Sequence, residues 1–228
     1  MGKQPWHESP PYTDEPCAST GRLDAKKKTM GATERDEQAR SVWREEVRHL
    51  PVSQMIFVDE CGSNIALTPL YARAPRGTRA HGSIPRNRGK NITLIASLSL
   101  AGMGAAFILE GSVNGTAFEI YVEQMLAPSL DAGQIVVMDN LRVHKSKRVQ
   151  QAIEARGCRL LFLPAYSPDF SPIEETFSKL KAFLRRAGAR TRDALQEVLA
   201  QSLLTVTVQD ARGWFEHCGY SSPNDKMG

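Results

Sequence analysis

Two short apolar runs in this chain each end in an aspartate. Residues 55–58 (MIFV) are followed by Asp59, and residues 135–138 (IVVM) are followed in the same way by Asp139. Short apolar runs rich in Val, Ile and Phe are typical of buried strands. A carboxylate at the end of a buried strand is costly to desolvate unless something compensates its charge. If the two strands are parallel neighbours, both carboxylates emerge at one edge of the same sheet.

The order of the predicted elements indicates the fold class. Strands are predicted over 53–60, 64–72, 91–100, 105–113, 134–140 and 159–164, and helices over 33–49, 116–126, 146–156, 172–186 and after Thr191. Three or four antiparallel strands followed by a β-α-β-α alternation predict an α/β protein with a mixed five-stranded sheet and helices on both faces. This layout resembles a ribonuclease-H-like fold, but function has to be derived from the site rather than from the fold.

Composition divides the chain into four segments. The first is rich in Pro, Ser and Thr and shows no hydrophobic period, so we predict it to be disordered or unrelated to the rest. In the second, a helix is predicted, and Thr33 with Asp36 three residues on resembles its N-terminal cap. The predicted boundaries are 1–25 for the N-terminal segment, 26–52 for a linker helix, 53–220 for the α/β domain and 221–228 for a flexible tail.

Composition also excludes several classes of protein. The chain has 228 residues and a mild net charge of +4, enough for one sizeable α/β domain. No apolar run approaches the roughly 18 residues that span a bilayer, and the N-terminus lacks the apolar core of a secretory signal, so we expect no membrane partner. The 4 cysteines stand singly with no CxxC pair, which argues against a zinc knuckle or a disulfide framework and is compatible with a reducing cytoplasm.

A third acidic residue follows a proline-rich turn. The turn AYSPDFSP (165–172) leads into a predicted helix that carries Glu174 in its first turn. Carboxylates that share a site repel one another, by about 4 kcal/mol for a pair about 4 Å apart at an effective dielectric of about 20. Divalent Mg²⁺ removes that cost, and a pair of such ions can stabilise both the attacking and the leaving oxygen of an in-line displacement at phosphorus.

Each carboxylate also has a purely structural explanation. The two aspartates are explained equally well as polar strand ends. Ser171 with Glu174 three residues on matches a capping box, with Pro at the first helical position. Two neighbouring acids are weaker candidates for the site. Glu60 is expected on the opposite sheet face from Asp59, and Glu175 about 100° further round its helix than Glu174.

Four segments resemble the mariner-like superfamily of DDE transposases, and in particular its bacterial insertion-sequence branch. They are FVDECG (57–62), VMDNLRVH (137–144), LPAYSPDFSPIEETFSKLK (163–181) and DARGWFEHCGY (210–220), within a resemblance that runs from about residue 26 to residue 220. The resemblance maps the family's triad onto Asp59, Asp139 and Glu174, and implies that they hold two Mg²⁺ or Mn²⁺ ions. Its DNxxxH pattern places Asn140 and His144 beside the metal site, where a structural and a catalytic role are both open.

Basic residues are the candidate contacts to DNA. The stretch 73–90 has no acidic residue and contains several Gly and Pro, so it is predicted to be a loop between strands. Such a loop next to a metal site suits backbone phosphates and would give steep salt dependence, although a merely solvated charged loop is the alternative. A second cluster lies on the helix that carries Glu174. The candidates are Arg73, Arg76, Arg79, Arg86, Arg88, Lys90, Lys179 and Lys181.

The resemblance implies a function for the domain. It would be the catalytic domain of a transposase, cleaving and transferring DNA strands in cut-and-paste transposition, with transposon ends and target DNA as partners and a homodimer in the active complex. A bacterial cytoplasm, at the nucleoid, is the expected location.

One departure from the family keeps other functions open. Relatives carry N-terminal helix-turn-helix modules, which residues 1–25 do not resemble, so a separate or fused N-terminal DNA-binding part is expected. The alternatives are a truncated, non-catalytic DNA-binding remnant or regulator of a full-length transposase, and a ribonuclease-H-like nuclease that acts on other substrates.

Overall fold

The computed structural model describes residues 33–221. The predicted segment 1–25, the start of the predicted linker segment and the tail from residue 222 lie outside the described residues. Within the described range, no helix is both long and apolar enough to cross a membrane.

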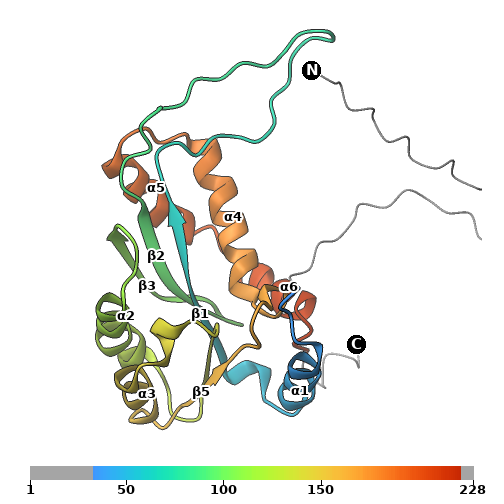
Figure 1. Ribbon diagram of the computed structural model, residues 1–228, viewed down its shortest axis with the longest axis vertical. Coiled ribbons are helices and arrows are strands. Elements are labelled where there is room, and N and C mark those ends of the chain that lie inside the picture. Colours follow the sequence, from blue (N-terminus) through green and yellow to red (C-terminus); the bar gives the residue numbers. More distant parts are fainter. Residues whose placement is uncertain (1–32, 222–228) are drawn as a thin grey trace, which may run out of the picture. The chain divides into compact units, whose positions relative to one another are not determined.

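Five strands form one mixed sheet in the order β3-β2-β1-β4-β5 (Figure 1). Their bounds are β1 Met55–Ser63, β2 Ile92–Ser99, β3 Gly102–Glu110, β4 Ile135–Met138 and β5 Arg159–Phe162. The pairs β1–β2 and β2–β3 are antiparallel, whereas β1–β4 and β4–β5 are parallel. The predicted five-stranded α/β layout is therefore confirmed, with three antiparallel strands leading into a parallel half.

Helices cover both faces of this sheet. They are α1 Glu37–Arg48, α2 Gly115–Tyr121 with its π-helical continuation Val122–Leu126, α3 Lys147–Glu154, α4 Pro172–Ala187, α5 Arg192–Leu203 and α6 Val208–His217. Buried side chains of α1, α4, α5 and α6 share one core cluster with one sheet face. Those of α2 and α3 share a second cluster with the other face.

The alternation of side chains along β1 decides which face each residue serves. Phe57 belongs to the core under α4, whereas Ile56 and Val58 belong to the core under α2 and α3. Burial of a side chain such as Phe57, which is 0% exposed, contributes about 1.5–3 kcal/mol. A one-residue slip of β1 would bring every one of these side chains to the wrong face, so the apolar run sets the register.

The predicted strand 64–72 is not a strand. Residues 64–91 instead form a long connection, here called the arm, which extends from the sheet between β1 and β2 (Figure 1). Because β1 already pairs with β2 and β4, the alternating segment that follows it cannot add a strand next to β1. Its backbone is held by a side chain, since Nη1 of Arg190 donates to the carbonyls of Ile65 and Leu67 at 3.0 and 2.8 Å.

Two helix predictions also need correction. The cap of α1 is Asp36, not Thr33, because Oδ1 of Asp36 accepts the N–H groups of Gln38 and Ala39 at 2.9 and 3.0 Å. The helix α6 was not predicted, although it opens with a capping box between Thr207 and Asp210. The sequence resemblance covered this segment without assigning it a secondary structure.

Candidate active site

The two strand-end aspartates leave the sheet next to each other. Val58 of β1 and Met138 of β4 are register partners in the parallel pair. Asp59 and Asp139 follow these partners directly, and both line one pocket on the α4 side of the sheet. The expectation that parallel strands bring both carboxylates to one edge is confirmed.

Each of these aspartates has one oxygen committed to the backbone. Oδ1 of Asp59 accepts the N–H of Glu60 at 2.7 Å, and Oδ1 of Asp139 accepts the N–H of Leu141 at 3.0 Å. Within residues 33–221, no hydrogen bond or ion pair engages Oδ2 of either side chain. The backbone therefore fixes the carboxylates and leaves one oxygen of each for the pocket.

Glu174 reaches the same pocket from the first turn of α4, and it does not cap the helix. Ser171 makes no side-chain capping bond. The N–H of Ser171, which a capping-box Glu174 would have to accept, already donates to the carbonyl of Pro168 at 2.9 Å. Glu174 is exposed and lines the pocket. The structural explanation for this glutamate is therefore wrong.

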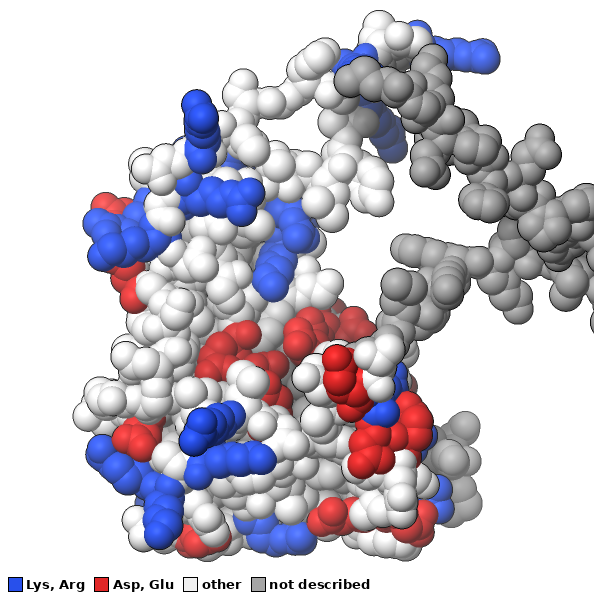
Figure 2. Space-filling view, in the orientation of Figure 1, with Lys and Arg blue, Asp and Glu red and all other residues white. Residues whose placement is uncertain are grey.

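The pocket encloses about 360 Å³ and combines carboxylates with an apolar wall. Besides the three acids it is lined by Asn140, Leu141, Leu163, Pro164, Ala165, Tyr166, Ser167, Pro168 and Ser171. None of these lining residues is a lysine or an arginine. In Figure 2 acidic side chains gather at the middle of the face, and basic side chains lie toward both ends, one of which carries the arm.

Two carboxyl groups of this pocket, those of Asp59 and Glu174, have raised pKa values. Burial and the negative charges of Glu174, Asp139 and Glu60 raise the pKa of Asp59 to about 8, against the opposing hydrogen bond from the Glu60 N–H. Burial and the charge of Asp139 raise the pKa of Glu174, which the positive charge of Lys181 opposes. The site therefore holds more negative charge than its surroundings neutralise.

This donor set fits a hard divalent cation. In the described part of the chain, no three His, Cys, Asp or Glu side chains are gathered closely enough to make a ready metal site. The pocket nevertheless presents carboxylate and amide oxygens without a competing cation, and oxygen donors are what Mg²⁺ takes. Asp59, Asp139 and Glu174 are the residues that could hold such an ion.

The structure places the two residues of the DNxxxH pattern differently. Asn140 is exposed and lines the pocket. His144 is fully buried and lies between two carboxylates: its Nδ1 is 2.5 Å from Oδ1 of Asp139, and its Nε2 is 3.0 Å from Oε1 of Glu60. The Nδ1 contact is an ion pair that lacks the alignment of a hydrogen bond. Burial lowers the pKa of His144, but these two carboxylates outweigh it and raise that pKa to about 10.

The predicted basic residues lie outside the pocket. Five of them, Arg73, Arg76, Arg79, Arg86 and Arg88, are exposed side chains of the arm. Lys90, at the end of the arm, forms an ion pair with Glu110 at 3.2 Å. Lys181 is partly exposed and close enough to Glu174 to affect its pKa. A role of these residues in DNA binding stays a prediction.

Lys179 makes contacts within the protein that were not predicted. Its Nζ donates to Oδ2 of Asp210 at 2.5 Å and to the carbonyl of Thr205 at 2.8 Å. These contacts arise because the unpredicted helix α6 supplies an acidic partner on this side of α4. The side chain therefore ties α4 to the start of α6, and its role in DNA binding stays a prediction.

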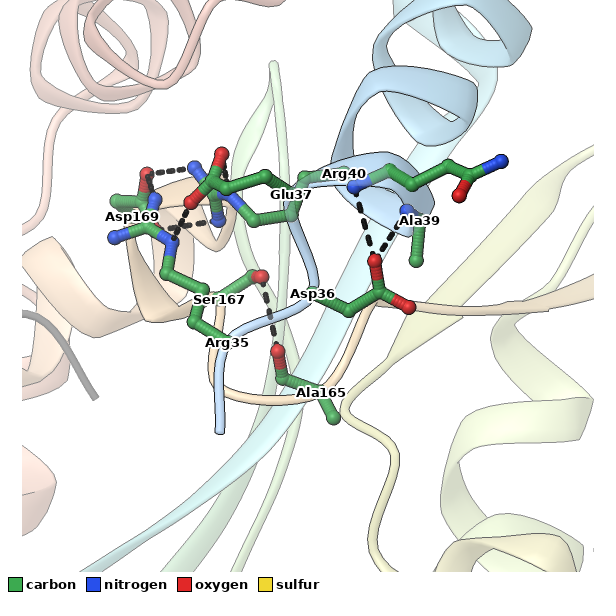
Figure 3. A network of polar contacts seen from close by, with 9 residues as sticks. Arg35, Asp36, Glu37, Ala39, Arg40, Ala165, Ser167 and Asp169 are labelled. Atoms are coloured by element: carbon green, nitrogen blue, oxygen red, sulfur yellow. Dashed lines mark hydrogen bonds and ion pairs between the residues drawn. The ribbon is translucent and has the colours of Figure 1, made fainter. Parts of the chain in front are cut away.

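Sequence reasoning missed a network that holds the turn before Glu174 (Figure 3). The guanidinium of Arg40, on α1, forms two hydrogen bonds with Asp169 at 2.7 and 3.0 Å, and Arg35 adds a third at 3.0 Å. Arg40 is 1% exposed and lies 4.0 Å from the ring centre of Phe170. Its spacing on the stripe with Trp43 and Val47 was the available signal, because an arginine on a buried helix face needs a partner.

A family model described as "DDE superfamily endonuclease" matches residues 54–196. No curated protein sequence matches this chain.

The fold is similar to solved structures of the Mos1 transposase. A pre-cleavage Mos1 transpososome has a TM-score of 0.65 at 17% identity, covering 88% of this chain and 65% of that chain. The Mos1 mariner paired-end complex with Mn has a TM-score of 0.64 at 17% identity, with the same coverage of 88% and 65%. The catalytic domain of Mos1 mariner transposase has a TM-score of 0.53 at 14% identity, covering 81% and 87%. The chain thus spans 65% of the length of the transpososome chain, and this likeness establishes the ribonuclease-H-like fold.

Proposed function

This chain belongs to the DDE superfamily endonucleases, and on that premise we propose that it is the catalytic part of a cut-and-paste DNA transposase. The observation that carries the proposal is the pocket in which Asp59, Asp139 and Glu174 meet without a lysine or arginine. The finer placement, in the bacterial insertion-sequence branch of the mariner-like superfamily, rests on the motif segments around these three residues. A place of action at the bacterial nucleoid, in the cytoplasm, belongs to the same proposal.

The three carboxylates are the proposed ligands of two Mg²⁺ or Mn²⁺ ions. When bound, such ions stabilise the attacking and leaving oxygens of an in-line displacement at phosphorus. Solved structures of the Mos1 catalytic domain with Mg and with Mn support this choice of metal. Burial and the neighbouring negative charges that raise the pKa of Asp59 support it as well, because bound cations would stabilise the charged carboxylate.

Two successive displacements at phosphorus make up the proposed reaction. In the first, a water oxygen attacks a phosphodiester at the element's end, the bond from phosphorus to the 3′ oxygen breaks, and a 3′-OH is released. In the second, that 3′-OH attacks a phosphodiester of target DNA and displaces its 3′ oxygen. The chain's own part is to hold the three carboxylates rigidly, which the backbone bonds to Asp59 and Asp139 support.

Binding of DNA is proposed for the basic side chains of the arm and for Lys181. The arm leaves the sheet from β1, the strand that carries Asp59, so phosphates bound along it would lead toward the pocket. The transposon ends and the target are the proposed DNA partners, in a homodimeric complex. Recognition of the ends is proposed to need a separate or fused N-terminal part.

The Glu174→Gln variant tests the proposed function. The assay measures cleavage of duplex DNA taken from both sides of the coding sequence, with Mg²⁺ or Mn²⁺ and with EDTA. Gln is a poor ligand for a hard cation, so we expect cleavage to fall by more than about 100-fold, beyond the loss typical of residues that only support metal ligands. Glu175→Gln is the matched control, because this neighbour on α4 pairs with His217 at 2.8 Å and does not line the pocket.

Two results would contradict the proposal. Full cleavage activity of the Glu174→Gln variant would show that Glu174 is not a metal ligand that the reaction needs. A folded wild-type protein that binds DNA but shows no metal-dependent cleavage would favour the regulator function instead.

A further inference from the structure

Glu60 stands next to a proposed metal ligand but faces the other side of the sheet. Asp59 points to the α4 side, and the following Glu60 therefore points toward the core beneath α2 and α3. The Glu60 side chain is only 14% exposed. A carboxylate in this position needs a partner of its own.

That partner is His144, which also reaches the proposed metal ligand Asp139. The ring is completely buried and packs on Phe118, with ring centres 4.3 Å apart. Its two nitrogens face two different carboxylates, Oε1 of Glu60 at 3.0 Å and Oδ1 of Asp139 at 2.5 Å. The ring is hydrogen-bonded to Glu60 and in close contact with Asp139. The three side chains form one chain of contacts, Glu60–His144–Asp139, that connects β1 to the end of β4.

This chain of contacts determines which oxygen of Asp139 can bind a ligand. Oδ1 faces the imidazole and also accepts the N–H of Leu141 at 3.0 Å. With Oδ1 held from two directions, the carboxylate cannot turn about its own axis, and Oδ2 is the oxygen left for the pocket.

We propose that Glu60 and His144 are positioning residues for metal binding at Asp139. His144 holds Oδ1 of Asp139, Glu60 holds His144, and Oδ2 is thereby presented to a divalent cation. The inference rests on the proposed function, because it assigns a role toward the metal that Asp139 would hold. Outer partners of ligating groups commonly contribute about 10- to 100-fold to metal affinity.

Two substitutions of His144 separate the two contacts of its ring. In His144→Asn the side-chain amide replaces Nδ1 and can still donate to Asp139, but it is too short for Glu60. In His144→Gln the amide replaces Nε2 and can still reach Glu60, but it leaves Asp139. Glu60→Gln keeps the size of the side chain and removes its charge. Glu123→Gln is the control, because this carboxylate pairs with Arg148 at 2.8 Å, away from the pocket.

The experiment measures the dissociation constant of Mn²⁺ for the full chain by titration calorimetry, with thermal unfolding of each variant alongside. Under the proposal, His144→Gln and Glu60→Gln weaken Mn²⁺ binding by about 10- to 100-fold. His144→Asn stays several-fold closer to wild type than His144→Gln, and Glu123→Gln binds as wild type does. A merely structural histidine would change the unfolding temperature of both His144 variants and would not separate their Mn²⁺ affinities.

The outcomes distinguish this inference from the function on which it rests. Wild-type Mn²⁺ affinity in folded Glu60→Gln and His144→Gln would overturn the positioning role. If Asp139→Asn loses Mn²⁺ binding in the same experiment, the assignment of Asp139 as a metal ligand still holds. If Asp139→Asn binds Mn²⁺ as tightly as wild type, the metal site itself is wrong. If His144→Gln does not fold, Glu60→Gln decides, because it changes no side-chain volume.

Discussion

Val58 and Met138 face each other as register partners in the parallel pair β1–β4, and each is followed by an aspartate of the pocket. Sheet pairing thus brings two carboxylates together before any side-chain contact is considered. The cost of this arrangement is visible in Asp59, whose pKa is raised by burial and by its acidic neighbours. The protein maintains an electrostatically unfavourable site, which is typical of a functional position.

The raised pKa of Asp59 predicts how stability depends on pH. Its folded-state pKa of about 8 lies above the ordinary value of 3.8, so folding favours the protonated carboxyl. The stability contributed by this group is complete below about pH 4 and is lost as the pH rises through about 8, at no more than about 1.4 kcal/mol per pH unit. We expect Asp59→Asn to be more stable than wild type at pH 8 and to lack this slope. Urea unfolding in EDTA at pH 5, 6.5 and 8 measures the free energy of unfolding of both proteins. The same pH dependence in wild type and Asp59→Asn would contradict the prediction.

Glu174→Gln is not expected to destabilise the protein, because Glu174 makes no capping bond and because burial and the charge of Asp139 already disfavour its charged form. Thr207→Ala provides the contrast. Its hydroxyl oxygen accepts the N–H of Asp210 at 3.1 Å in a capping box, so its loss should cost about 1 kcal/mol. Chemical denaturation of both variants tests this difference. A destabilised Glu174→Gln would mean that this glutamate supports the helix after all.

Lys179→Met and Lys181→Met are expected to have opposite effects. Lys179 ties α4 to Asp210, so its loss should reduce stability by about 1 kcal/mol, a value discounted for partial exposure, and leave DNA affinity unchanged. Lys181→Met should leave stability unchanged and reduce the salt dependence of DNA binding by about one phosphate contact. Urea unfolding and fluorescence anisotropy at several salt concentrations measure the two effects. An equal loss of DNA affinity in both variants would indicate that Lys179 contacts DNA as Lys181 does.

The Arg40–Asp169 ion pair predicts a rank order of stability for three variants. Asp169→Asn removes the bidentate carboxylate of a buried guanidinium and should cost about 2 kcal/mol. The cost is below that of a fully buried pair, because Asp169 is 49% exposed and Oε2 of Glu37 still lies 3.4 Å from Nε of Arg40. Arg40→Met removes the buried charge together with its partner contact and should cost less. Arg40→Lys cannot reproduce the paired hydrogen bonds, so it should not rescue stability. Thermal unfolding ranks the three variants, and an Arg40→Met protein less stable than Asp169→Asn would contradict this order.

Much of the site was predictable because strand periodicity is local. The apolar runs before Asp59 and Asp139 predicted buried strands, and alternation along β1 correctly separated Glu60 from Asp59. The contact between Glu60 and His144 was not predictable. Its partner His144 lies 84 positions away, and only the packing of the DNxxxH segment beneath β1 brings them together.

Local patterns were sufficient to predict the strands that end in carboxylates, the start of α4 at Pro172 and the amphipathic faces of the helices, since each depends on neighbours a few residues apart. Which of two competing local patterns forms depends on long-range packing. The capping box at Ser171 does not form, because the N–H of Ser171 donates to the Pro168 carbonyl. The alternating segment 64–72 cannot pair with β1, because β2 and β4 occupy both sides of that strand. The same is true of Asp169, which pairs with an arginine 129 positions away, and of Lys179, which pairs with Asp210 on α6. Each backbone N–H and each strand edge needs a partner, and the packing of distant segments settles which partner it finds.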